Sequence, residues 1–260
     1  MNTNQLCPKC KESSVLVPIT GNRWDSYHSR AEIALDCIEE GTIDAVITDP
    51  PYGSGGTTVA KRLRPSSEKY QSSDRKEKLP DIDGDAMLPE AWIRMMTTIF
   101  DKVRRACKPG ADLLVFCDWM SLTRFIEVIG AAGLYVRSVG IWDKGRCSRP
   151  NRNGMRNQVE MILHARRSGK VEREKDIYLN GVFQYPTMRN NKLHLTQKPL
   201  ELMHELMQLA PPEGIVLDPF QGSGTTGVAA LQTNRRYIGI ESVKHYHDIA
   251  IQRLQEFSTP

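Results

Sequence analysis

Short runs of apolar and β-branched residues alternate along the chain with longer amphipathic segments. The short runs are typical of buried strands, and they lie at Ile43–Thr48, Leu113–Cys117, Leu134–Trp142, Val159–His164, Ile215–Leu217 and Tyr237–Ile240. The longer segments repeat their apolar residues at helical spacing, and they lie at Trp92–Cys107, Ser121–Ala132, Pro199–Leu209 and Thr225–Gln232. This alternation predicts an α/β fold in which a mainly parallel sheet carries helices on both faces.

Two of the predicted strands, Leu134–Trp142 and Val159–His164, follow each other without a helix between them. We expect them to form an antiparallel hairpin, because a crossover between parallel strands usually contains a helix. In open sheets of this class, ligands bind at the carboxyl ends of the strands. Functional motifs are therefore expected directly after strands, and two are found there.

The first of these motifs is a glycine turn. The strand that ends at Leu217 is followed by Asp218-Pro219-Phe220-Gln221-Gly222-Ser223-Gly224-Thr225-Thr226. A Gly-x-Gly turn before a helix lets the backbone approach a ligand closely and presents free N–H groups to it. No Lys precedes Thr225, which argues against a nucleoside triphosphate loop, whereas a dinucleotide fold stays open on this feature alone. Glu241 ends the next strand, where it is either a surface glutamate or an acceptor for two ribose hydroxyls.

The second motif is Asp49-Pro50-Pro51-Tyr52, directly after the strand Ile43–Thr48. Two prolines fix the backbone, so that the carboxylate of Asp49 and the carbonyl of Pro50 can form a preorganised pair of acceptors. An exocyclic amino group has two hydrogens to donate to such a pair. Tyr52 offers a face on which a base can stack. The alternative is an ordinary Pro-Pro turn with an incidental aromatic residue.

Composition and charge narrow the class of protein. A chain of 260 residues with 40% hydrophobic residues fits one large α/β domain, and no apolar run is long enough to span a membrane. The polar start of the chain and the six scattered cysteines favour the cytoplasm. Cys7 and Cys10 form half of a zinc site without a second pair, so we expect no metal, with a structural zinc as the alternative.

Basic residues and one long polar segment suggest contact with an anionic partner. The net charge is only +4, but basic clusters occur at 61–64, 144–156 and 166–175. They include Arg146, Arg149, Arg152, Arg166 and Arg167, which we interpret as phosphate contacts rather than as solvated loop residues. Residues 53–86 are rich in Gly, Ser, Lys and Asp and are predicted to form a mobile loop.

Taken together, the two motifs resemble those of the amino-methyltransferases that modify adenine N6 or cytosine N4 in DNA. The Asp-Pro-Pro-Tyr tetrapeptide precedes the cofactor glycines, as in the beta class of that family. The resemblance implies a Rossmann-like methyltransferase fold with a mostly parallel, seven-stranded sheet and one antiparallel hairpin. It also implies an N-terminal extension at 1–30, a catalytic domain at 31–260 and S-adenosyl-L-methionine as the cofactor.

The resemblance assigns roles to individual residues. Asp49, Pro50, Pro51 and Tyr52 would act on the target amine. Asp218, Phe220, Gly222 and Gly224 would shape the cofactor turn, with Thr225 and Thr226 near the methionine carboxylate and Glu241 on the ribose. Lys198, in the segment His194–Pro199, would lie close to the methionine moiety. Asp36 and Cys37, after a predicted strand Ala31–Leu35, would read the adenine ring of the cofactor.

A base within a duplex cannot reach such a pocket, so the resemblance implies that the target base is flipped out and that residues 53–86 close around it. The beta class reads its target sequence with residues that correspond here to 166–193, a short segment. We therefore expect a homodimer acting on double-stranded DNA.

Adenine N6 is the expected target because an aspartate opens the tetrapeptide, and cytosine N4 is the alternative. An RNA or protein-amide methyltransferase and a non-enzymatic nucleic-acid-binding module are further alternatives.

Overall fold

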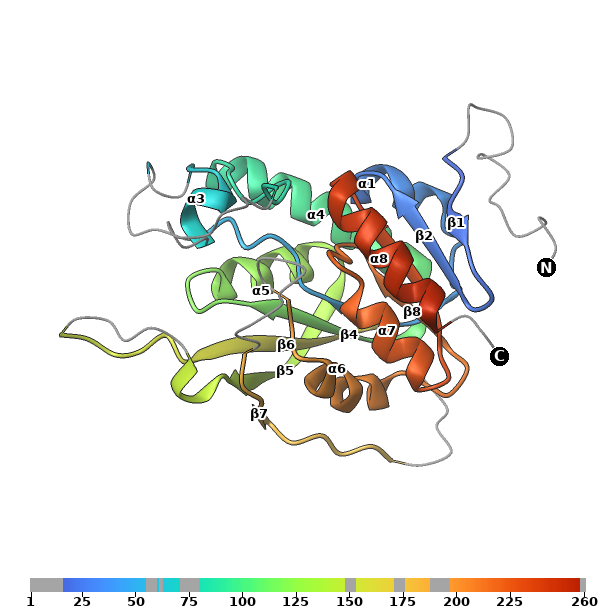
Figure 1. The fold of residues 1–260 in the computed structure, drawn as a ribbon. Coiled ribbons are helices and arrows are strands. Elements are labelled where there is room, and N and C mark those ends of the chain that lie inside the picture. Colours follow the sequence, from blue (N-terminus) through green and yellow to red (C-terminus); the bar gives the residue numbers. More distant parts are fainter. Residues whose placement is uncertain are drawn as a thin grey trace.

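The computed structural model of the chain describes residues 16–54, 60, 63–70, 80–147, 153–170, 176–187 and 197–257. These residues build one sheet with helices packed against both of its faces (Figure 1). The α/β class predicted from the sequence is therefore confirmed.

The described part of the sheet has nine strands in the spatial order β1-β2-β9-β8-β3-β4-β6-β5-β7. Their bounds are β1 Ile19–Thr20, β2 Trp24–His28, β3 Ile43–Thr48, β4 Cys107–Cys117, β5 Leu134–Asp143, β6 Val159–Arg167, β7 Val182–Gln184, β8 Ile215–Asp218 and β9 Arg236–Glu241. The strands from β2 to β4 run parallel, whereas β6 runs antiparallel to both β4 and β5. The predicted hairpin is confirmed, and the short edge strands β1 and β7 extend the expected seven strands to nine.

One predicted strand is wrong. Residues 31–35 begin with helix α1 (Ala31–Ala34) and lead into a 3-10 turn, Leu35–Cys37. The buried residues Ala31, Ala34 and Leu35 follow the spacing of a helix face. The missing strand is β2, which pairs with β9 along its whole length. The sheet thus begins before residue 31, within the segment that we expected to be an N-terminal extension.

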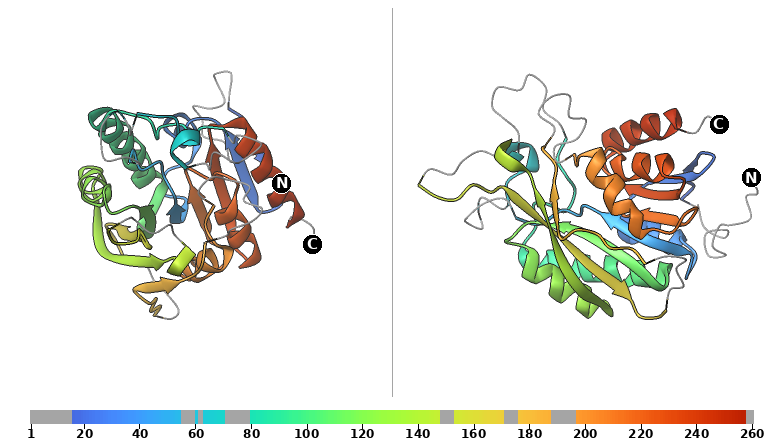
Figure 2. Two further views of the ribbon diagram at one scale, coloured as in Figure 1. Left: turned by 60° about the vertical axis from the view of Figure 1, so that its left-hand side comes forward. Right: turned by 90° about the horizontal axis from the view of Figure 1, so that it is seen from below.

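The helices form two layers. Helices α1, α4 (Pro89–Ala106) and α5 (Leu122–Ala131) cover one face of the sheet, and α6 (Leu200–Leu206), α7 (Thr225–Gln232) and α8 (Lys244–Glu256) cover the other (Figure 2). Trp92, Phe100 and Phe125 centre the first core, where the rings of Trp92 and Phe125 meet edge to face at 4.9 Å. Each buried side chain of this size stabilises the fold by about 1.5–3 kcal/mol relative to an exposed one. The two layers hold the strand ends rigidly in place.

The described parts of residues 53–86 include a short helix and a buried ion pair. Helix α3 (Ser66–Tyr70) carries Lys69, whose Nζ lies 2.6 Å from Oδ2 of Asp85, and both side chains are 3% exposed. The same amino group donates to the carbonyl of Ser54 at 3.2 Å. This buried ion pair ties the beginning and the end of the segment together. Its predicted mobility stays a prediction.

Among the described residues, no helix combines the length and the apolar character that a membrane span requires.

Candidate active site

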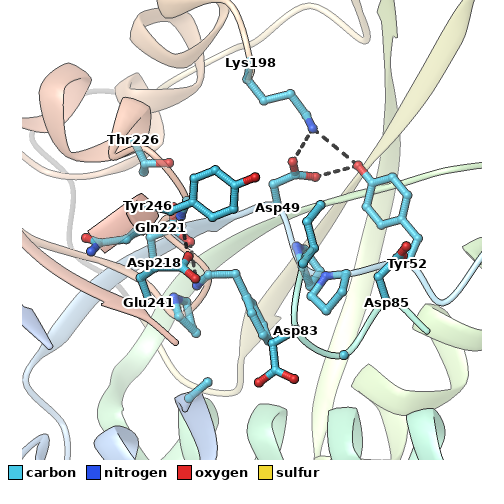
Figure 3. Close-up of a pocket in the computed structure, with 18 of the residues that line it drawn as sticks. Asp49, Tyr52, Asp83, Asp85, Lys198, Asp218, Gln221, Thr226, Glu241 and Tyr246 are labelled. Carbon is cyan, nitrogen blue, oxygen red and sulfur yellow. Dashed lines mark hydrogen bonds and ion pairs between the residues drawn. The ribbon is translucent and has the colours of Figure 1, made fainter. Parts of the chain in front are cut away.

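A cavity of about 380 Å³ lies at the carboxyl ends of β2, β9, β8, β3 and β4. Its volume falls in the range of small-molecule pockets. Both sequence motifs line it, with the Asp49–Tyr52 tetrapeptide after β3 and the glycine turn after β8 (Figure 3). The order of the strands therefore brings together two motifs that are separated by about 170 residues in the chain.

The glycine turn is built from left-handed backbone. Gly222 has a φ of 52° and Gly224 a φ of 78°, and Gly224 is the N-cap of α7. A Cβ added at Gly224 would lie 3.0 Å from the Cβ of Ala250 on α8, so the turn has no room for a larger residue. The first turn of α7 follows directly, and Thr225 and Thr226 line the cavity. The predicted cofactor turn is thus an open helix N-terminus that faces a pocket.

The carboxylate of Glu241 is fixed beside this turn. It accepts the N–H of Gly222 at 3.0 Å on Oε2 and the N–H of Val243 at 2.8 Å on Oε1. Burial raises its pKa to about 7, although these backbone bonds lower it. Glu241 lines the cavity, and each of its oxygens keeps a lone pair for a further donor.

Asp218 connects the two motifs. Its Oδ1 accepts the hydroxyl of Thr48 at 2.7 Å and the N–H of Phe220 at 3.1 Å. Thr48 immediately precedes Asp49, so this carboxylate fixes the end of β3 against the glycine turn. Burial raises the pKa of Asp218 to about 6, and the bond from Thr48 opposes this rise. Asp218 and Phe220 both line the cavity, as predicted.

Asp49 and Tyr52 face each other in the other half of the cavity. The hydroxyl of Tyr52 donates to Oδ1 of Asp49 at 2.6 Å, and the ring of Tyr52 packs edge-on against Phe125. Trp92 donates its indole N–H to the carbonyl of Pro51 at 2.8 Å, which anchors the tetrapeptide backbone. Burial raises the pKa of Asp49, and the ammonium group of Lys198 opposes this rise.

Lys198 lies closer to the tetrapeptide than the resemblance implied. Its Nζ forms an ion pair with Oδ2 of Asp49 and lies 3.5 Å from the hydroxyl of Tyr52 (Figure 3). It also lies 3.4 Å from Oε2 of Glu160 on β6. These contacts place the charge of Lys198 beside the tetrapeptide, instead of beside the glycine turn.

Asp36 and Cys37 do not line the cavity, which corrects their expected position. The side chain of Asp36 is 61% exposed and pairs with Lys102 on α4 at 2.7 Å, and Cys37 is buried in the core. Because the strand of this region is β2 and not Ala31–Leu35, the pair lies beyond the edge of the pocket. Residues 29–32, which directly follow β2, line the cavity in its place.

The structure places the arginines that were predicted to contact phosphates at two different ends of the sheet. Arg166 donates from Nε and Nη2 to the buried Asp112 at 2.7 and 3.0 Å, and Arg167 donates to the carbonyl of Cys107. Both arginines lie at the end of β6, whereas the start of that strand lines the cavity, so they are at the opposite end of the sheet from it. The two arginines therefore serve the fold, which corrects their expected role. Arg146 is exposed after β5, on the cavity side.

Several other predicted positions lie outside the described residues. They are Arg149, Arg152, His194 and the Cys7–Cys10 pair. Among the described residues, no three His, Cys, Asp or Glu side chains gather as metal ligands would.

Sequence reasoning missed Glu160, Lys144, Trp119 and Arg253. Arg253 of α8 donates to the carbonyl of Ser223 at 2.6 Å and to the hydroxyl of Thr225 at 3.1 Å, which fixes the glycine turn. Trp119, after β4, lines the cavity although it is 61% exposed. Glu160 could have been found, because a charged residue inside an apolar strand is unusual and needs a partner.

Known proteins resemble this chain over most of its length. YubD of Escherichia coli (strain K12), a methylase by name, is 30% identical over 213 residues, which are 82% of each chain. A DNA modification methylase of Thermus thermophilus, solved with S-adenosyl-L-methionine, has a TM-score of 0.66 and 20% identity over 91% of this chain and 94% of its own.

The cytosine-N4-specific PvuII DNA methyltransferase has a TM-score of 0.65 and 17% identity over 90% of this chain and 87% of its own. These two structures establish the fold. The model of the N6/N4 DNA methylase family matches residues 43–252, which include both motifs of the cavity. The chain belongs to the DNA methylase family of N6 and N4 amino-methyltransferases, with the motif order of its beta class.

Proposed function

We propose that this protein uses S-adenosyl-L-methionine to methylate the N6 amino group of adenine in double-stranded DNA. The observation that carries the proposal is the shared cavity. The carboxylate of Asp49 and the left-handed turn at Gly222 open into one space, with the acceptor on one side and Thr225 at the helix N-terminus on the other.

The residues of the cavity fit the chemistry of the cofactor. The first turn of α7 presents N–H groups and threonine hydroxyls to a carboxylate, such as that of the methionine moiety. Glu241 offers acceptors to a pair of ribose hydroxyls. Asp218 and Phe220 would complete the walls of this half of the cavity.

When bound, the cofactor supplies a methyl group that its sulfonium centre already activates. The protein therefore needs to bind, orient and exclude water, and proximity supplies most of the rate enhancement. Asp49 accepts a hydrogen of the target amine and turns the nitrogen lone pair toward the cofactor half of the cavity. Tyr52 stacks on the base, and its hydroxyl keeps Asp49 in place. After the methyl transfer, the amine releases a proton to water or to Asp49.

The target base must leave the duplex to reach Asp49, because the acceptor lies inside a cavity and not on a surface. Residues 82–85 line the mouth of this cavity and end the 53–86 segment. We propose that this segment closes around the flipped base. Trp119 stands exposed at the mouth, where it meets the DNA.

Cytosine N4 is the second candidate. The fold matches the cytosine-N4-specific PvuII enzyme as well as it matches the Thermus methylase, with TM-scores of 0.65 and 0.66. Both amines present the same two hydrogens to Asp49. Adenine is preferred here because the family resemblance associates an opening aspartate with N6 methylation.

Product identification tests both candidates. The purified protein is incubated with tritiated cofactor and unmethylated plasmid duplex, with RNA and with a protein mixture in parallel. The labelled DNA is digested to nucleosides and analysed by mass spectrometry. N6-methyldeoxyadenosine supports the proposal, and N4-methyldeoxycytidine replaces it with the second candidate. Label in RNA or protein but not in DNA contradicts both.

A further inference from the structure

Four charged side chains of alternating sign form a row along the target side of the cavity. Lys144 follows β5, Glu160 lies on β6, Lys198 precedes α6 and Asp49 follows β3. The Nζ of Lys144 lies 3.0 Å from Oε1 of Glu160, and Oε2 of Glu160 lies 3.4 Å from Nζ of Lys198. Lys198 then forms an ion pair with Asp49.

The row is shielded from solvent. The exposed fraction of its side chains is 13% for Lys144, 20% for Glu160, 6% for Lys198 and 22% for Asp49. Charges act on one another much more strongly here than at the surface, because little water is present to screen them. A change in one charge of the row therefore alters the electrostatic energy of the others.

Lys198 is also fixed in position by aromatic rings. Its Nζ lies 5.0 Å from the ring centre of Phe116, 5.8 Å from that of Trp142 and 5.9 Å from that of Tyr52. A cation in such a box is attracted to the ring faces. Lys198 thus stays beside Asp49 even though its flexible side chain has many other rotamers.

This cation presents an electrostatic problem for amine methylation. The amine nitrogen gains positive charge as it takes up the methyl group, and a buried ammonium group beside Asp49 opposes that charge. A second carboxylate is needed to offset Lys198 without displacing Asp49. Glu160 is placed to do this, because it contacts the side of the ammonium group that Asp49 leaves open.

On the basis of the proposed function, we propose that Glu160 is a positioning residue for the methyl transfer. It holds Lys198 and the hydroxyl of Tyr52, and so it keeps Asp49 oriented and electron-rich toward the target amine. The hydroxyl of Tyr52 lies 3.3 Å from Oε2 of Glu160 and 2.6 Å from Oδ1 of Asp49. Lys198, in turn, organises the target side of the site instead of binding the methionine moiety.

The titration of the row agrees with this arrangement. Burial alone raises the pKa of Glu160, but Lys198 and Lys144 outweigh it and lower that pKa, so Glu160 stays ionised. Burial raises the pKa of Asp49, Lys198 lowers it and Glu160 raises it again. The other titratable groups that face Asp49 are Tyr52, Cys117 and Asp218.

The first test replaces the charge of Glu160 without changing its shape. Glu160→Gln should lower kcat for methyl transfer to plasmid DNA by at least tenfold, while the Kd for S-adenosylhomocysteine stays within twofold. The acid limb of the kcat–pH profile should move to lower pH, because loss of the Glu160 charge lowers the pKa of Asp49. A defect in folding alone would lower the amount of active protein without moving that limb.

Matched variants keep the test specific. Asp101→Asn makes the same carboxyl-to-amide change at an exposed ion pair on α4, and it should leave kcat and the pH profile unchanged. Glu160→Asp keeps the charge, but its side chain is shorter by one methylene group, so the carboxylate lies farther from Lys198. It should lower kcat less than Glu160→Gln does, with the acid limb at its wild-type pH. This variant also carries the test if Glu160→Gln does not fold.

A double-mutant cycle shows whether Glu160 acts through Lys198. In a Lys198→Met background, Glu160→Gln should lower kcat much less than it does in the wild-type background, because no ammonium group is left to offset. If the two substitutions multiply independently, the proposed coupling is wrong.

The proposed function and this inference fail in different ways. If the wild-type chain transfers no methyl group to DNA, RNA or protein, the proposed function fails. If wild type methylates DNA and both Glu160 variants match it in kcat and in pH profile, the function stands and the inference is overturned.

Discussion

At the scale of single residues, Asp49 is the side chain on which the proposed reaction depends. Its two oxygens are occupied by the hydroxyl of Tyr52 and by Lys198, which fix the carboxylate before any substrate arrives. Such preorganisation is what a site needs when catalysis relies on orientation instead of a covalent intermediate.

Asp49→Ala should abolish methyl transfer, by at least a thousandfold, while it leaves the Kd for S-adenosylhomocysteine within a few-fold of wild type. The reason is that Asp49 lies on the target side of the cavity, whereas the glycine turn and Glu241 lie on the other. Calorimetric titration of the variant measures the Kd, and tritium transfer to DNA measures the rate. A loss of cofactor binding as large as the loss of rate would contradict this division of the cavity.

Glu241 should make cofactor binding depend on pH near neutrality. Its pKa is raised to about 7, so the unliganded carboxyl is mostly protonated at pH 6 and mostly ionised at pH 8. If the ionised form accepts the ribose hydroxyls, the Kd for S-adenosylhomocysteine should fall about tenfold from pH 6 to pH 8. Glu241→Gln should bind more weakly at pH 8 and show a flatter profile. If the Kd of this variant changed with pH as the wild-type Kd does, the titrating group would be another one, and Asp218 would be the next candidate.

At the scale of elements, the sheet order explains what could be read from the sequence and what could not. The tetrapeptide and the glycine turn are local patterns, so each was recognisable alone, and the rule that ligands bind at strand ends placed them together. Six of the seven predicted strands are confirmed. Strand β2 was missed because it contains the polar residues Asp25, Ser26 and His28, although Ser26 is buried.

Contacts across the sheet could not be predicted. Glu160 meets Asp49 and Lys198 because β6 lies beside β4, which lies beside β3, and this order depends on tertiary packing. The pairing of Arg166 with Asp112 also depends on tertiary packing, because it requires the register of β6 against β4. Arg166, which the sequence suggested as a phosphate contact, therefore turned out to form an internal ion pair, while an isolated glutamate joined the site.

The junction of α7 and α8 should be sensitive to the loss of one glycine. Gly224→Ala places an L side chain at a φ of 78°, which costs about 1–2 kcal/mol, and it brings Cβ within 3.0 Å of Ala250. We expect a lower Tm and weaker cofactor binding. Ala250→Gly in the same chain should relieve the steric part but not the backbone part, so thermal unfolding should recover only partly. Full recovery would show that the left-handed backbone contributes nothing.

The loop after β4 offers a direct signal of DNA binding. Trp119 is 61% exposed, whereas Trp24, Trp92 and Trp142 are at most 3% exposed, and the chain has four tryptophans. Duplex DNA at the mouth of the cavity should therefore change the fluorescence of Trp119 above all. Trp119→Phe should lose most of the signal while labelled DNA still binds by anisotropy. A signal that persists in this variant would place the DNA elsewhere.

At the scale of the whole molecule, the cavity is at one end of the sheet. Positive charge must be present at that end to bind the phosphates of a duplex. Arg146 is exposed on that side, and the sequence continues with Arg149 and Arg152, which lie outside the described residues. Arg166 and Arg167 are engaged at the opposite end. The proposed DNA surface is therefore confined to one end of the molecule.

Replacing Arg146, Arg149 and Arg152 with Ala should weaken duplex binding and flatten its salt dependence in proportion to the phosphates that these side chains neutralise, because each neutralised phosphate releases about one counterion. A control removes the same charge from exposed positions toward the other end, at Lys108, Arg137 and Arg236. The control should keep the wild-type salt slope, and equal slopes in both variants would contradict the proposed surface.

The expected dimer belongs to the same scale. The segment that we expect to read the target sequence, residues 166–193, is short, and β6 takes up Arg166 and Arg167 while β7 takes up three more residues at the edge of the sheet. One copy thus has little chain left with which to read a target sequence, and a second copy on the same duplex would extend the contact. Light scattering with and without DNA measures the mass. We expect a dimer at least on DNA, and a monomer that methylates duplex in both states would show that one copy reads the site alone.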